Sequence, residues 1–103
     1  MNGKPSASAS ADEELRLLRR IQRALSDSNP RLALALLGEL DQSVPRSQLM
    51  EERQAAAVMA GCQLEGDQGA RAASARAFER RYPDSLYRGR IRQTCGMPGS
   101  REE

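Results

Sequence analysis

Large apolar side chains recur every three or four residues along most of the chain, which is the spacing of one face of an α-helix. The first such segment covers residues 12–26, where Leu15, Leu18, Ile21 and Leu25 share a face. The segment begins with acidic residues, and carboxylates stabilise the positive end of a helix. We therefore expect a first helix over residues 12–26 whose leucine and isoleucine face is buried.

The second apolar segment, residues 30–42, differs because its leucines and alanines are not confined to one face. Asn29 and Pro30 stand before it in the order of an N-cap and a first helical residue. A helix that is apolar nearly all round is usually buried on several sides. We expect residues 30–42 to form the central helix of the fold.

Two further helical segments follow, over residues 47–64 and 67–82. Asp67 is a natural N-cap for the second of them, and alanine, the residue with the best helix propensity, fills much of it. Pro83 ends it, because proline disfavours helical geometry at the residue before it. The side chains that we expect to be among the most buried are Leu36, Leu37, Leu40, Met59 and Phe78.

A short last helix is expected near the C-terminus. It should start after Asp84 or Ser85 and run to about Thr94. Gly96 then stands at the position where helices often end with a glycine. The sequence thus predicts an all-α fold of five helices.

The two ends of the chain differ in composition from the helical part. Residues 1–11 are rich in serine and alanine and can bury little apolar surface, so we expect a flexible linker. Residues 97–103 contain proline, glycine and charges and should be a disordered tail. One helical domain over residues 12–96 remains. No segment reaches the ~18 consecutive apolar residues of a membrane span.

The helical part repeats itself at an offset of 38 residues. The equivalent residues are Asn29 and Asp67 as helix caps, Leu40 and Phe78, and Pro45 and Pro83. Each repeat is a pair of helices that would leave an apolar face in water if it stood alone. Stacking the two pairs buries that face, and the last helix can close the stack.

This pattern resembles the tetratricopeptide repeat (TPR) family and its looser relatives over residues 12–95. The family has small residues in the first helix and early in the second helix of each repeat, then a large apolar residue and a proline. The matching residues are Ala24, Cys62 and Ala33 at the small positions, Leu40 and Phe78 at the large apolar position, and Pro45 and Pro83 at the closing position. The segment Phe78–Ser85 is especially similar to repeats of bacterial cell-envelope proteins.

The resemblance implies a right-handed stack of two TPR-like helical hairpins plus a C-terminal capping helix. The chain departs from the family in its period of 38 residues against about 34, and Arg71 stands where the family has a small residue. Repeats of this family bind partner proteins and do no chemistry. In this chain the first, third and fifth helices would line the groove.

Basic residues gather late in the chain, although the net charge of the whole sequence is only +2. Seven arginines and two carboxylates lie between residues 69 and 96. A solvated, arginine-rich helix face explains this pattern, and a basic surface for nucleic acid is the alternative. The residues of that candidate basic face are Arg76, Arg80, Arg81, Arg88, Arg90 and Arg92.

No histidine occurs among the 103 residues, which removes the commonest metal ligand and the commonest general base at neutral pH. We therefore expect no enzyme activity, no metal, no cofactor and no small-molecule substrate. Cys62 and Cys95 are too few for a zinc site and form no Cys-x-x-Cys motif. They are either two buried thiols or, if the domain is exported, a disulfide that pins the last helix.

Taken together, these features predict a non-enzymatic protein–protein interaction or scaffold domain of a larger bacterial, membrane-anchored envelope protein. Its partner would be another protein or the rest of its own polypeptide. The expected location is the periplasm, with the cytoplasm as the other option. The alternative function is a small arginine-rich helical domain that binds nucleic acid, which we expect less because few aromatic residues are present to stack on bases.

Overall fold

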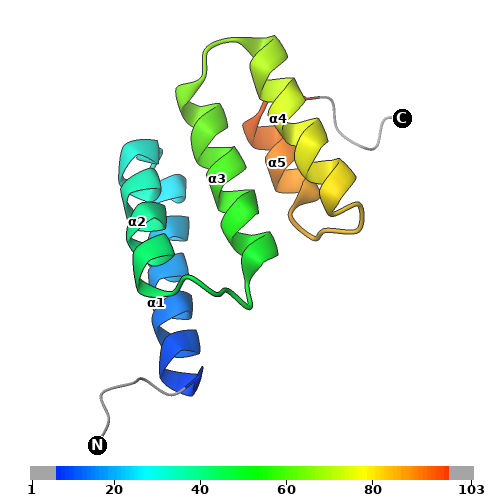
Figure 1. Cartoon of the computed structure of the whole chain (residues 1–103). Coiled ribbons are helices and arrows are strands. Elements are labelled where there is room, and N and C mark those ends of the chain that lie inside the picture. Colours follow the sequence, from blue (N-terminus) through cyan, green and yellow to red (C-terminus); the bar gives the residue numbers. More distant parts are fainter. Residues whose placement is uncertain (1–6, 98–103) are drawn as a thin grey trace, which may run out of the picture.

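The computed structural model describes residues 7–97, which form five helices and no strand (Figure 1). The prediction of an all-α fold is therefore confirmed. The helices are α1 (Ala7–Ser26), α2 (Pro30–Ser43), α3 (Met50–Leu64), α4 (Gln68–Arg81) and α5 (Arg88–Thr94). The expectations for residues 1–6 and 98–103 lie outside the described residues.

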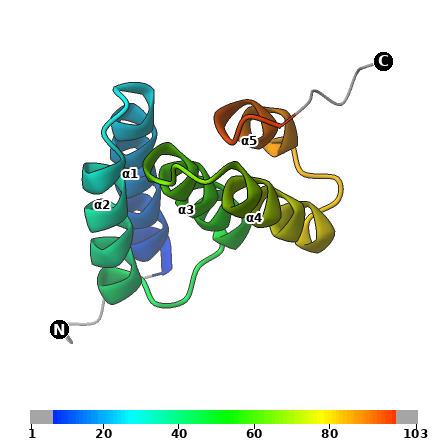
Figure 2. The ribbon, with the colours of Figure 1, turned by 90° about the horizontal axis from the view of Figure 1, so that it is seen from above.

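Helix α3 is the central element, because it contacts each of the other four helices (Figure 2). Helices α1 and α2 form an antiparallel pair, and α3 packs against both of them. Helix α5 then packs against α3 and α4. The third helix and the fifth helix thus each pack against both helices of the pair that precedes them.

The expectation that residues 30–42 form the central helix was wrong. Leu32 and Leu34 of α2 are 43% and 39% exposed, and Ala35 is exposed as well. The central place goes to α3 because Ala55, Ala56 and Ala60 are fully buried on different sides of it. Small side chains let neighbouring helices approach closely from several directions. The expected core residues Leu36, Leu37, Leu40, Met59 and Phe78 are all buried, as predicted.

Helix α1 begins at Ala7, five residues before the expected start, so residues 7–11 are helical rather than part of a linker. Alanine has the highest helix propensity, which accounts for the extension. The acidic residues 12–14 consequently lie beyond the first turn. The buried face of α1 is also rotated from the expected one, because Leu17 is buried and Leu15 is 41% exposed.

Helix α5 begins at Arg88, later than the expected start after Asp84 or Ser85. Tight turns occupy the intervening residues, in which the Ser85 amide donates to the Tyr82 carbonyl at 3.1 Å. The Ser85 hydroxyl accepts a bond from the Tyr87 amide at 3.0 Å. Met97, expected in a disordered tail, packs partly buried against the core.

A buried ion pair joins α1 to α3. The Nε atom of Arg53 donates to Oε2 of Glu14 at 2.9 Å, and both side chains are buried. The Arg53 guanidinium also donates to the carboxylate of Asp41 at 3.0 Å and to the carbonyl oxygen of Val44. Ser47 donates to Glu14 as well. This network fixes the α2–α3 connection against α1.

Substitution of Glu14 by glutamine should lower the free energy of unfolding by about 3 kcal/mol, because the Arg53 charge would then be buried without its main partner. Urea unfolding followed by circular dichroism measures the loss. Glu13→Gln is the matched control, since Glu13 pairs with Arg16 at the surface, where side chains are 32% and 65% exposed. The control should change stability by less than about 0.5 kcal/mol. Equal effects of the two variants would contradict the prediction.

Helix α1 ends in a backbone arrangement that normally uses glycine. The amide of Ser28 donates to the Leu25 carbonyl at 3.0 Å and the amide of Asn29 to the Ala24 carbonyl at 2.8 Å. This closure places Ser28 in the left-handed region, with φ of 55°. The equivalent residue of the second repeat, Gly66, does not have a positive φ.

We therefore expect Ser28→Gly to raise the free energy of unfolding by about 1 kcal/mol, because glycine adopts a positive φ without the cost that a Cβ atom imposes. Gly66→Ala is the matched test of the other repeat. It should not destabilise the protein, because no atom lies within 4 Å of the Cβ that alanine would add. Thermal and urea unfolding measure both changes. A loss of stability in Gly66→Ala would contradict the described difference between the repeats.

Candidate binding groove

A groove of about 600 Å³ lies between α1, the start of α3 and the start of α5. Figure 2 shows α1 and α5 apart from each other, with α3 between them. Its apolar lining comes from all three elements: Leu15 and Leu18 of α1, Leu49 before α3 and Tyr87 before α5. The helices that line it are those that sequence analysis assigned to a groove.

The rim of the groove is cationic. Arg19 and Arg23 come from α1 and Arg90 comes from α5, whereas Glu52 is the one carboxylate among the described lining residues. The side chains of Arg19 and Arg23 make no ion pair or hydrogen bond within residues 7–97. Both guanidinium groups are thus available to an anionic ligand.

Tyr87 places a phenol in the groove. Burial raises the pKa of the Tyr87 hydroxyl above its ordinary value, the carboxylates of Glu52 and Glu51 raise this pKa further, and Arg90 lowers it. The hydroxyl is therefore protonated at neutral pH. It can donate a hydrogen bond to a ligand while its ring offers apolar surface.

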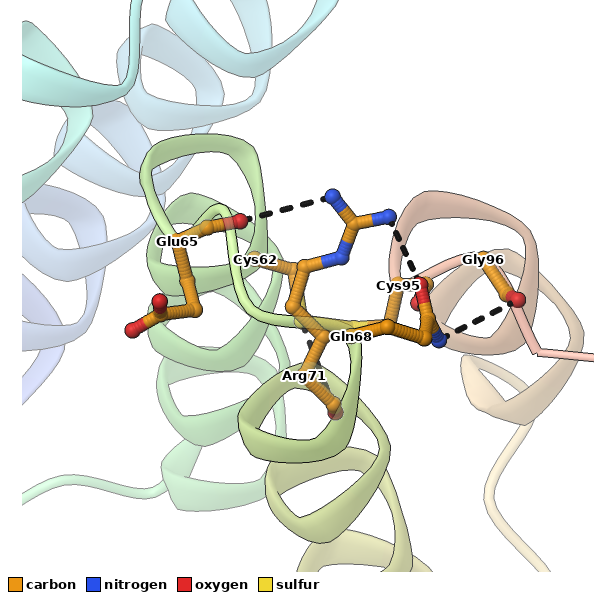
Figure 3. Close-up of a disulfide and its surroundings, with 6 residues drawn as sticks. All are labelled: Cys62, Glu65, Gln68, Arg71, Cys95 and Gly96. Carbon is orange, nitrogen blue, oxygen red and sulfur yellow. Dashed lines mark hydrogen bonds between the residues drawn. A yellow bond between two sulfur atoms is a disulfide. The ribbon is translucent and has the colours of Figure 1, made fainter.

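A disulfide between Cys62 and Cys95 joins the last turn of α3 to the C-terminal end of α5, with Cα atoms 5.1 Å apart (Figure 3). Sequence analysis left two buried thiols and a disulfide open for this pair. Both residues are buried. Since α5 begins next to Tyr87 and contains Arg90, the disulfide holds the helix that forms one wall of the groove.

Polar contacts around the disulfide attach the end of α5 to the start of α4. The side-chain amide of Gln68 donates to the carbonyl oxygens of Cys95 at 3.1 Å and Gly96 at 3.4 Å (Figure 3). Arg71 in turn donates to the side chain of Gln68 at 3.1 Å and to the Glu65 carbonyl at 3.4 Å. Gly96 has φ of 72°, and the expected glycine at this helix end is therefore required by the backbone.

A second attachment of α5 is ionic. Arg92 binds the carboxylate of Glu79 on α4 with two hydrogen bonds, of 2.6 Å from Nε and 2.9 Å from Nη2. A bidentate pair of this kind fixes orientation as well as distance. Together with the buried side chain of Ile91, it holds α5 against α4 and α3.

The six arginines of the candidate basic face differ in their surroundings. Arg92 is paired with Glu79, and Arg90 points into the groove, where it donates to Gln22 at 3.3 Å. Arg81 lies over the Tyr82 ring and lines a separate hollow between α3 and α4. Arg88 donates to the Pro83 carbonyl at 2.8 Å. Of the six, Arg76 and Arg80 remain as exposed side chains on α4 without a described partner.

Sequence analysis missed the groove residues of α1. Leu15, Arg19, Gln22, Arg23 and Ser26 all line the groove. Leu15, Arg19, Gln22 and Ser26 follow one another at intervals of four, three and four residues, which is the spacing of a second helical stripe beside the buried one. An apolar residue at the head of a stripe of arginines was the signal in the sequence, but it was interpreted as part of the core.

Within residues 7–97, no cluster of three or more metal-ligating side chains is placed to hold a metal ion. In the same part of the chain, each helix is too short or too polar to cross a membrane. Comparison with models of protein families, with curated proteins and with solved structures finds no match for this chain.

Breaking the Cys62–Cys95 disulfide should lower the free energy of unfolding by about 3–4 kcal/mol, because it closes a loop of 33 residues. Urea unfolding with and without dithiothreitol measures the loss, and intact mass counts the free thiols. The amides of α5 should also lose protection in hydrogen exchange, while those of α2 should not. The Cys62→Ser/Cys95→Ser variant is the control, because dithiothreitol should leave its stability unchanged. Two free thiols in the air-oxidised protein would contradict this prediction.

Proposed function

We propose that this chain is a non-enzymatic protein-interaction domain of the TPR-like type and that the groove between α1, α3 and α5 binds a segment of another protein. The groove carries the proposal. Its volume is within the range of about 300–1,000 Å³ that is typical of binding sites. Its lining also combines apolar side chains with polar groups that can orient a ligand, as recognition sites do.

The packing of the helices supports the TPR-like part of the proposal. Helix α3 packs against α1 and α2, and α5 packs against α3 and α4 in the same order. Helices α2 and α4, which are the second helices of the two repeats, also begin alike, with side-chain caps from Asn29 and Asp67. The 38-residue repeat of the sequence thus has a counterpart in the contacts of the fold.

The chemistry of the groove suits binding rather than catalysis. Its described ionisable side chains are arginines, one glutamate and a tyrosine that stays protonated. Nucleophilic catalysis needs a nucleophile beside a base that activates it. The two cysteines, which would be the strongest nucleophiles, are joined to each other.

We place the domain in the periplasm of a bacterium, as part of a membrane-anchored envelope protein. The disulfide supports an oxidising compartment, because such bonds are rare in the cytosol. The resemblance of residues 78–85 to envelope repeats supports the same context. Three arginines of the candidate basic face already have partners, because Arg92 binds Glu79, Arg90 binds Gln22 and Arg88 binds the Pro83 carbonyl. We therefore do not propose nucleic-acid binding.

Photo-crosslinking in the organism that encodes the protein tests the proposed function. The photoreactive residue p-benzoylphenylalanine replaces Leu15 in the groove or, as the matched control, Ala35 on the exposed side of α2. We expect discrete protein adducts from position 15 and none of the same mass from position 35. Adducts that are the same at both positions, or none from the groove, would contradict the proposal.

A further inference from the structure

We infer that the groove selects an acidic segment that also carries a large apolar side chain. This inference rests on the function proposed above, since it names the partner of the same groove. It requires that one ligand satisfy both the cationic rim and the apolar lining. The arginines of the rim favour the acidic groups of the segment, and the apolar lining favours its large apolar side chain.

The positive charge of the groove favours a negatively charged ligand. Arg19 and Arg23 are one helical turn apart on α1, and Arg90 lies on α5, so cations line two walls of the groove. Glu52 offsets one of the three. A concave surface with an excess of one charge concentrates ligands of the opposite charge. Guanidinium groups bind carboxylates with two parallel hydrogen bonds, which favours aspartate and glutamate as the anionic groups.

The apolar lining determines the rest of the ligand. Leu15 is 41% exposed in the groove, and Leu49 and Tyr87 are partly exposed. A purely anionic ligand, such as a phosphate chain, would leave this surface in water. A leucine or aromatic side chain of a peptide would cover it and gain the free energy of apolar burial. A mixed acidic and apolar segment therefore uses both sets of groups.

A selection from short random peptides displayed on phage, with the disulfide-bonded domain immobilised, tests the inference without a known partner. We expect the enriched peptides to combine aspartate or glutamate with leucine or an aromatic residue, and to be poor in lysine and arginine. The affinity of a synthetic copy of the best peptide is then measured by fluorescence anisotropy. It should fall about tenfold or more in Arg19→Glu/Arg23→Glu, since two charge-assisted contacts are reversed.

The matched control is Arg31→Glu/Arg76→Glu, which changes the net charge equally at two exposed residues outside the groove. This control should keep the affinity within about twofold. Arg19→Lys/Arg23→Lys keeps the charge but loses the paired hydrogen bonds of each guanidinium, so it should weaken binding, though less than the charge reversal does. Leu15→Ser should weaken binding without changing its dependence on salt, because it removes an apolar contact. Circular dichroism establishes that each variant is folded.

The outcomes separate the partner class from the function itself. Enriched peptides that are neutral or basic, yet lose affinity in the groove variants, would overturn the acidic partner and leave the proposed function standing. An equal loss in the control variant would show attraction to net charge alone and would overturn the inference. A single-stranded oligonucleotide that binds the groove more tightly than the peptide would also overturn it. Peptides whose affinity is unchanged in every groove variant would contradict the proposed function as well.

Discussion

The other four helices must approach the backbone of α3 closely, and the rest of the structure depends on this constraint. Four helices pack around α3, and they can do so because Ala55, Ala56 and Ala60 leave its backbone accessible from several sides. Larger residues at these positions would push neighbours apart, and packed interiors tolerate extra volume poorly. Apart from Met59 of α3, the larger apolar side chains of the described core therefore come from the neighbours, such as Leu40 of α2 and Phe78 of α4.

The groove is a consequence of this arrangement. Helices α1 and α5 both pack against α3, whereas no packing between α1 and α5 is found among the described residues. Their facing sides remain open, and the Arg90–Gln22 hydrogen bond spans the space between them. Side chains that would be core residues in a closed bundle, such as Leu15, thus remain exposed.

Local features of the fold could be predicted from the sequence, but the tertiary contacts between distant residues could not. The caps at Asn29 and Asp67 follow from nearby residues and were predicted correctly. The burial of Leu36, Leu37, Leu40 and Phe78 was also predicted correctly. The burial of Glu14 was not predictable, because its partner Arg53 is 39 residues away in the chain. The apolar spacing of α1 likewise places Leu15 on or next to its apolar face. It does not show whether another helix covers Leu15.

The shortest helix of residues 7–97 supplies one wall of the groove. Helix α5 has seven residues, and an isolated helix of this length is not stable in water. It exists because Ile91 and Cys95 are buried, Arg92 is paired with Glu79 and the disulfide joins it to α3. Because α5 is the helix that positions Arg90, the shape of the groove depends on these attachments. The disulfide therefore supports the proposed binding site, although neither sulfur lines the groove.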